Sequence, residues 1–266
     1  IDDPADARLE DYRNVPDAEL IQQRGIFVAE GRLVVARLLE GSHFKARSVL
    51  VTETALRALG TATPVEPTLP IYVVPQWVIN AIAGFDIHRG CLAIGERTPS
   101  PTWQDVAANA RRMVVIEKVA NADNVGAIFR HAAAFEVDAV LLEATCADPL
   151  YRKAIRTSMG ATLRVPYARA EPWPSGLHEL RARGWSLVAL TPSAGTTLQS
   201  VVSGLGRNRS AQRVAIVLGH EGEGLSAEAL GACHDQARIP MAGSVDSLNV
   251  ATACAIALYE LTRSSA

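Results

Sequence analysis

Short, continuous apolar runs separated by helical stretches constrain the fold of this chain more than any other feature. The runs are MVVI, VDAVLL, LRVP, WSLVAL, VAIVLG and ARIP, all within residues 113–240 and each bounded by turn residues. A strand with one face in water alternates apolar and polar residues, whereas a strand covered on both faces is apolar throughout. The runs therefore predict an α/β fold, with a parallel sheet between two layers of helices.

A separate set of runs precedes these and indicates a smaller α/β domain. IFVAEG, ARSVLV, PIYVV and CLAIGE are typical of strands, and GRLVVARLLEG is typical of a helix that ends at Gly41. The stretch RTPSPTW places two prolines and a serine between a strand-like run and a new helix, which is typical of a domain boundary. We expect two α/β domains, at residues 1–98 and 103–266.

Composition narrows the class of protein. The chain has 266 residues, of which 48% are hydrophobic and 20% charged, as in ordinary soluble globular proteins. No apolar run approaches the roughly 20 residues that cross a bilayer, and the acidic first 25 residues lack a signal-peptide core. The cysteines are scattered without a C-x-x-C pair, at Cys91, Cys146, Cys233 and Cys254. We therefore expect a cytoplasmic protein with no membrane partner, no disulfides and no metal site.

The loop after MVVI leads into a helix with one apolar stripe. The stripe recurs at helical spacing in Val125, Ile128, Phe129, Ala132 and Phe135. Arg130 points to the opposite side, and Asn124 is expected to cap the helix. A capped helix with a surface arginine is the alternative interpretation.

Two further expected strands end in loops of unusual composition. GHEGEGLS (219–226) is a tight glycine-rich loop that brings backbone close to a ligand, yet it matches neither the P-loop nor the dinucleotide fingerprint. MAGSVDSLNVATACA (241–255) follows ARIP, and a helix is expected to start near Ser247, with Asn249 in its first turn pointing back toward the loops. A plain glycine-rich turn and a plain helix cap at Ser247 are the alternatives.

Parallel strands place their carboxyl ends at one edge of a sheet, where ligands bind in open α/β folds. The three loops are therefore expected to form one pocket, with five polar side chains around it: Asn124, Arg130, Glu221, Ser247 and Asn249.

One segment is locally basic although the net charge of the chain is −2. YRKAIRTSMGATLRVPYAR carries five basic residues and no acid: Arg152, Lys153, Arg156, Arg164 and Arg169. Such a face suits RNA phosphates, and we expect RNA contacts from Arg152, Lys153, Arg156 and Ser158. A solvated helix flank is the alternative.

The three loops carry a family resemblance. NVGAIFR, LGHEGEGLS and IPMAGSVDSLNVATACAIALYE resemble, in order, spacing and context, the signature motifs of the SpoU (TrmH) family of RNA ribose 2′-O-methyltransferases, within the SPOUT superfamily. The resemblance covers residues 112–263. More loosely, FVAEGRLVVARLL and GFDIHRGCLAIGE resemble the ribosomal-protein-like substrate-binding domain that precedes many of these catalytic domains. One departure is ANADNVG, where the family more often has a proline or arginine before the asparagine.

The resemblance implies an α/β knot, a homodimer through the catalytic domain, and methylation of a ribose 2′-hydroxyl in RNA, with ribosomal RNA favoured over transfer RNA. It implies S-adenosylmethionine as cofactor, held by Thr191, Pro192, Leu218, Gly219, Ile239, Met241 and Leu248. It also implies that Arg130 helps to activate the hydroxyl, within a catalytic cluster of Asn124, Glu221, Ser247 and Asn249.

Two routes remain open for Arg130, because a guanidinium stays protonated in proteins. It could hold an RNA phosphate that accepts the proton, which is the route we favour, or act as a base with a depressed pKa. Three alternative functions are an RNA-binding protein that has lost catalysis, an antibiotic-resistance ribosomal RNA methyltransferase and a nucleotide-dependent oxidoreductase. The sequence lacks the dinucleotide-binding fingerprint loop that the oxidoreductase would need.

Overall fold

A computed structural model describes residues 1–13, 16–60, 67–83, 90–205, 212–242 and 246–263. The chain divides into two compact units. The first unit comprises residues 1–99 and 148–164, and the second comprises residues 100–147 and 165–266. The segment 148–164, which we expected within a C-terminal domain at 103–266, therefore groups with the N-terminal residues.

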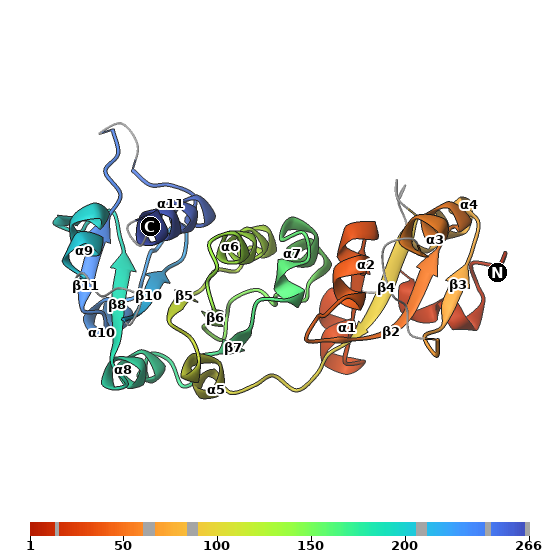
Figure 1. Ribbon diagram of the computed structural model, residues 1–266, viewed down its shortest axis with the longest axis horizontal. Coiled ribbons are helices and arrows are strands. Elements are labelled where there is room, and N and C mark those ends of the chain that lie inside the picture. The colour runs from red at the N-terminus through yellow and green to blue at the C-terminus, as the bar shows by residue number, and fades with distance from the viewer. Residues whose placement is uncertain (14–15, 61–66, 84–89, 206–211, 243–245, 264–266) are drawn as a thin grey trace. The chain divides into compact units, whose positions relative to one another are not determined.

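The second unit is built on a seven-stranded sheet in the order β7-β6-β5-β10-β8-β11-β9 (Figure 1). Its strands are β5 (Arg112–Ile116), β6 (Ala139–Leu142), β7 (Tyr167–Arg169), β8 (Trp185–Leu190), β9 (Thr196–Thr197), β10 (Arg213–Leu218) and β11 (Asp235–Arg238). All neighbouring strands run parallel. The expected parallel-sheet α/β fold is confirmed.

Helices cover both faces of this sheet. They are α5 (Trp103–Ala108), α6 (Ala122–Ala134), α8 (Ser175–Ala182), α9 (Leu198–Gly204), α10 (Ala227–Ala232) and α11 (Val250–Arg263). Along β5, Met113 and Val115 join a core cluster with α5, α8 and α10, whereas Val114 and Ile116 are buried outside that cluster. Helices α6 and α11 pack side by side (Figure 1). Because both faces are covered, the central strands β5, β6, β8 and β10 are mostly apolar. The outer strands β7, β9 and β11 carry polar residues.

One expected strand is wrong. LRVP does not form a strand, because Ala161–Leu163 form a short 3-10 helix and β7 begins only at Tyr167. The side chain of Leu163 is fully buried in a core of the first unit, so its apolar character does not belong to the sheet. Pro166 contributes a backbone acceptor instead, since its carbonyl accepts a hydrogen bond from the Val140 amide at 2.9 Å.

The first unit has a four-stranded sheet in the order β1-β4-β2-β3. Its strands are β1 (Ile26–Glu30), β2 (Lys45–Val51), β3 (Ile71–Val73) and β4 (Cys91–Glu96), which confirms all four strands expected before residue 98. The expected helix is α2 (Arg32–Leu39), which ends just before Gly41. The other helices are η1 (Ala7–Tyr12), α1 (Asp17–Gln23), α3 (Glu53–Gly60), α4 (Gln76–Ala83) and α7 (Arg152–Thr157).

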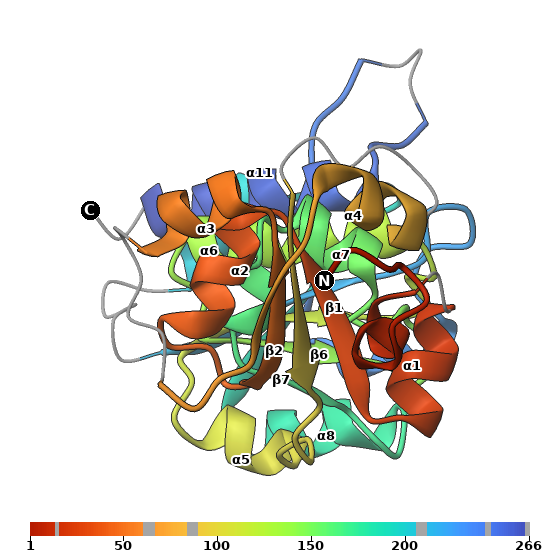
Figure 2. The same cartoon turned by 90° about the vertical axis from the view of Figure 1, so that its right-hand side faces the viewer.

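Apolar side chains of β1 alternate between the two faces of this sheet. Figure 2 shows the strands β1 and β2 of the sheet with the helices α2 and α3 beside them. On β1, Phe27 packs in a cluster with α2 and α3, while Ile26 and Val28 pack in a second cluster with η1 and α4. The ribosomal-protein-like character of this unit, and the knot in the second, stay predictions.

The segment 148–164 is an integral part of the first unit. Leu150, Ile155 and Leu163 belong to the same core as α2 and α3. The Arg152 Nε donates to Asp17 Oδ1 at 2.6 Å. The Arg37 guanidinium donates to the carbonyl of Met159. The segment thus supplies both apolar and polar contacts to the N-terminal residues.

Within the described ranges, no helix is long and apolar enough to cross a membrane.

Candidate functional site

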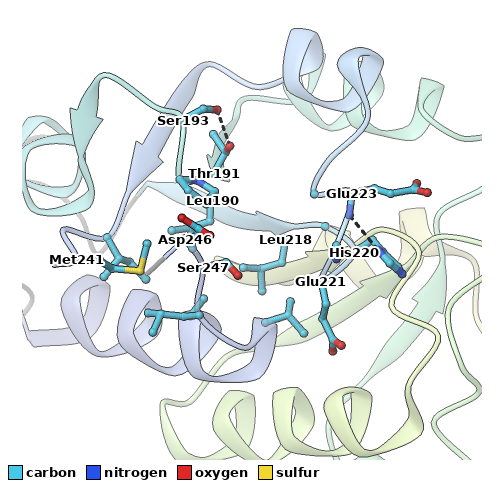
Figure 3. A pocket seen from close by; sticks show the side chains of 18 residues that line it. Leu190, Thr191, Ser193, Leu218, His220, Glu221, Glu223, Met241, Asp246 and Ser247 are labelled. Carbon is cyan, nitrogen blue, oxygen red and sulfur yellow. Dashed lines mark hydrogen bonds between the residues drawn. The ribbon is translucent and has the colours of Figure 1, made fainter. Parts of the chain in front are cut away.

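A cavity of about 400 Å³ lies where β8, β10 and β11 end, within the second unit (Figure 3). Three loops bound it, and Figure 3 shows Thr191 and Ser193 from the first, Leu218 and His220 from the second, and Met241 and Ser247 from the third. The loop after β5 contributes no lining residue, so the expectation that it forms part of the pocket is wrong. Every residue expected to hold the cofactor lines this cavity: Thr191, Pro192, Leu218, Gly219, Ile239, Met241 and Leu248. Cavities of this size hold small molecules in other proteins.

The first loop is fixed to the neighbouring strand. The Thr191 amide donates to the Ala237 carbonyl of β11 at 3.0 Å. The Arg238 Nη1 donates to the carbonyls of Ala194 and Gly195 at 2.8 and 3.1 Å. Arg238 therefore holds the far end of this loop, a role that its sequence context did not reveal.

The glycine-rich loop after β10 folds back on itself. A Cβ at Gly219 would lie 2.3 Å from the backbone carbon of Gly224, so only glycine fits there. The His220 amide donates to the Gly224 carbonyl at 3.1 Å, and the Gly224 amide donates back to the His220 carbonyl at 2.9 Å. This close approach confirms the tight loop expected from the sequence.

His220, and not Glu221, holds the backbone donors of this loop. The ring Nδ1 of His220 accepts from the amides of Gly222 and Glu223 at 3.0 and 3.1 Å. The Glu221 side chain is exposed, and Figure 3 shows its carboxylate pointing away from the His220 ring. The expectation that Glu221 fixes the neighbouring backbone donors is wrong, although Glu221 does line the cavity.

The cap expected for α6 is also wrong, and so is the alternative in which Ser247 caps α11. Helix α11 begins at Val250, and Asn249 caps it, because its Oδ1 accepts from the amides of Ala251 and Thr252 at 3.0 and 3.2 Å. Ser247 lines the cavity instead. Helix α6 is capped by Asn121, whose side chain accepts from the Asp123 amide. The sequence misled because two residues able to cap lie near the start of each helix, Asn121 and Asn124 for α6 and Ser247 and Asn249 for α11.

A direct contact joins two of the predicted catalytic residues. The Asn249 Nδ2 donates to Asn124 Oδ1 at 3.0 Å. Asn124 is buried in the first turn of α6, while Asn249 lies at the exposed start of α11. This hydrogen bond between two side-chain amides links the start of α6 to the start of α11. Neither residue lines the cavity.

Arg130 lies on the exposed side of α6, as expected. Val125, Ile128, Phe129 and Ala132 are fully buried, and Phe135 is half-buried with its ring centroid 6.4 Å from that of Tyr259. Arg130 is exposed and does not line the cavity. It is therefore available to a bound molecule outside the pocket.

The basic segment has mixed roles. Arg152 pairs with Asp17, and the Arg169 Nη1 donates to the carbonyls of Glu143, Ala144 and Cys146. The Ser158 side chain is fully buried, and its hydroxyl donates to the Ile155 carbonyl at 2.9 Å, so we do not retain it as an RNA contact. The side chains of Lys153, Arg156 and Arg164 are exposed.

Sequence reasoning missed the buried carboxylate of Glu117. Glu117 directly follows β5, is 1% exposed and accepts hydrogen bonds from Trp173 and Ser226. The sequence did contain a signal, because Glu117 directly follows the apolar run MVVI. A charged residue buried at such a position needs hydrogen-bond partners.

All four cysteines are free and buried. Burial raises the pKa of the Cys254 thiol to about 12, which keeps it protonated and unreactive at neutral pH. Among the described residues, no group of three or more His, Cys, Asp or Glu side chains is placed to hold a metal ion.

Comparisons with known proteins identify relatives of the whole chain. The chain is 41% identical over 267 residues to an uncharacterized tRNA/rRNA methyltransferase of Mycobacterium bovis, covering 98% of this chain and 91% of the relative. Its fold matches the AdoMet-bound rRNA methyltransferase of Sinorhizobium meliloti, with TM-score 0.82, 25% identity and coverage of 99% and 97% of the two chains. It also matches an RNA 2′-O ribose methyltransferase, with TM-score 0.78, 25% identity and coverage of 100% and 98%.

Residues 111–259, which contain all three loops of the cavity together with α6 and most of α11, match the SpoU rRNA Methylase family. On this match, and on the Mycobacterium relative that spans nearly the whole chain, the protein belongs to the SpoU rRNA methylase family of RNA methyltransferases.

Proposed function

We propose that this protein transfers a methyl group from S-adenosylmethionine to a ribose 2′-hydroxyl in structured RNA, and that its target is ribosomal rather than transfer RNA. The observation that carries the proposal is the three-loop cavity, since it gathers every residue expected to hold the cofactor. The structural relatives support the chemistry, one being an AdoMet-bound rRNA methyltransferase and another an RNA 2′-O ribose methyltransferase.

The lining of the cavity suits this cofactor. Leu218, Ile239 and Leu248 offer apolar surface to an adenine ring. The acids Glu221 and Asp246 stand at the same cavity, where they favour a ligand that carries a sulfonium and an ammonium group. When bound, the cofactor supplies a methyl group on sulfur that is already primed for displacement.

The protein's own residues must then position the RNA. Arg130 carries a guanidinium that stays protonated, and its planar fork suits a phosphate held by two hydrogen bonds. We propose that Arg130 anchors a phosphate of the target nucleotide and that this phosphate accepts the hydroxyl proton. The alternative is that Arg130 is itself the base. The Asn124–Asn249 bond keeps α6, and therefore Arg130, in place beside α11.

Three further assignments belong to this proposal. Lys153 and Arg156 contribute phosphate contacts that hold RNA without reading its sequence. A second copy of the chain covers Ile256 and Tyr259 of α11, which are large apolar side chains left 37% and 54% exposed. The protein works in the cytoplasm, which suits its four free thiols.

The test is methyl transfer from S-adenosylmethionine with a labelled methyl group to ribosomal RNA, followed by digestion to nucleosides. We expect one 2′-O-methylnucleoside, and activity that persists in the presence of a chelator. Label on a base would refute the ribose target. No label on any RNA, together with retained RNA binding, would favour the catalytically inactive alternative.

A further inference from the structure

Glu117 contacts the cofactor loop at both of its ends. The loop, Gly219–Leu225, leaves β10 at Leu218 and reaches α10 at Ser226. At the entry, the Glu117 amide donates to the Leu218 carbonyl at 2.9 Å. At the exit, Glu117 Oε2 accepts from the Ser226 amide at 2.8 Å, and Oε1 accepts from the Ser226 hydroxyl at 2.7 Å. One residue thus fixes the separation between the two ends of the loop.

The exit contact is a firm anchor for two reasons. The Ser226 Oγ also accepts from the Ala229 amide at 3.2 Å, so Ser226 is the N-cap of α10 and its side chain cannot rotate freely. Leu225, the residue before it, is buried in the core cluster on that face of the sheet. Between these fixed ends, Gly219 and Gly224 pack backbone to backbone.

The Glu117 carboxylate is buried and accepts three hydrogen bonds. Glu117 is 1% exposed, and burying a charge is costly unless hydrogen bonds compensate. Its third donor is the Trp173 Nε1, 2.8 Å from Oε1. All of these donors are neutral N–H or O–H groups, which bind a carboxylate more strongly than a neutral oxygen.

We infer that Glu117 is a positioning residue for the methyl-transfer reaction, which sets the shape of the cofactor loop by holding Leu218 and Ser226 together. The inference rests on the proposed assignment of the cavity to S-adenosylmethionine. Glu117 does not line the cavity and acts only through the loop.

The test compares Glu117→Gln with Glu143→Gln. Gln keeps the shape but turns an NH₂ group toward a donor, so contacts with Ser226 or Trp173 are lost. Glu143 is the matched control, because it is another buried carboxylate that follows a neighbouring strand, and it accepts from the Lys118 amide and the Thr145 hydroxyl, away from the loop. A second pair is Ser226→Ala, which removes the hydroxyl donor, and Ser226→Thr, which restores it.

Two measurements distinguish an effect on the loop from an effect on cofactor binding. In the ligand-free protein, amide hydrogen exchange at residues 219–226 should speed up in Glu117→Gln and Ser226→Ala, and stay unchanged in Glu143→Gln and Ser226→Thr. With cofactor, KM for S-adenosylmethionine should rise about tenfold in the first two variants, the size expected for one lost buried hydrogen bond, while kcat at saturation changes little.

Loop exchange that is the same in Glu117→Gln and Glu143→Gln would overturn the inference. So would faster loop exchange with an unchanged KM. The proposed function is tested separately by Gly219→Ala, which pushes a Cβ into the Gly224 backbone. If that variant also keeps its KM, the assignment of the cavity to the cofactor fails as well.

Discussion

At the scale of single residues, the proposed chemistry depends most on Arg130. Its helix buries an apolar stripe on the other side, so the exposed Arg130 contributes nothing to that core. We predict that Arg130→Ala folds normally and binds S-adenosylmethionine with unchanged affinity, while methyl transfer falls roughly a hundredfold or more. Calorimetry and single-turnover methylation measure the two effects. Wild-type turnover would make this arginine a surface charge.

Arg130→Lys separates the two routes, because lysine keeps the charge but loses the planar fork. If Arg130 only anchors a phosphate, Arg130→Lys should keep partial activity, and the loss of activity should become smaller as the RNA concentration rises. If Arg130 is itself the base, Arg130→Lys should restore the rate at a shifted pH optimum, because the pKa of lysine is lower than that of arginine. The pH–rate profile of this variant decides between them.

Asn249 has two functions that substitutions can separate. Asn249→Ala removes both the cap of α11 and the donor to Asn124, and should cost about 1–2 kcal/mol of unfolding free energy. Asn249→Asp keeps a capping oxygen but cannot donate, so stability should largely recover while methyl transfer stays low. Denaturant unfolding and turnover check this prediction. Full activity in Asn249→Asp would show that the hydrogen bond from Asn249 to Asn124 has no role in catalysis.

At the scale of helices and strands, the sequence predicted what depends on local burial. Strands β5, β8 and β10 are covered on both faces, so their sequences are mostly apolar and could be recognised. LRVP could not be assigned correctly, because the core that buries Leu163 is formed largely by residues between 21 and 93, far away in the sequence. The family resemblance pointed to the cofactor residues that line the cavity, whereas of the five polar side chains expected from the loops only Glu221 and Ser247 line it. The roles of His220 and Glu117 depend on contacts that neither composition nor resemblance shows.

The segment 148–164 yields a prediction at this scale. Arg152 pairs with Asp17, with side chains 21% and 24% exposed, so Arg152→Glu should place like charges together and destabilise the first unit. Arg156 is exposed, so Arg156→Glu should leave stability unchanged and weaken RNA binding similarly for different sequences. Thermal unfolding and filter binding at low salt measure these effects. Unchanged RNA affinity in Arg156→Glu would leave the basic segment as a solvated flank.

At the scale of the whole molecule, the proposed dimer accounts for the exposed face of α11. Tyr259→Asp should convert a dimer into a monomer, since a buried carboxylate without a partner is costly at an interface. Trp77→Asp is the matched control, because Trp77 is 55% exposed but belongs to the first unit. Light scattering at micromolar concentration gives the mass of each. A wild-type monomer, or a monomer only with Trp77→Asp, would refute this interface.

The cofactor cavity has its own matched pair of variants. Gly219→Ala should weaken S-adenosylmethionine binding by about tenfold or more, because the loop backbone must move. Gly231→Ala is the control, since a Cβ there meets no atom within 4 Å. Calorimetry on both proteins checks the prediction, and equal affinities would place the cofactor elsewhere.

The most direct test of the central claim is a map of 2′-O-methylated nucleotides in RNA from a strain that lacks this protein, compared with its parent. We predict that one ribosomal RNA position loses its ribose methyl group in the deletion strain. The wild-type gene should restore that methyl group, and the Arg130→Ala gene should not. Identical maps in the two strains, or a missing base methyl in place of a ribose methyl, would contradict the claim.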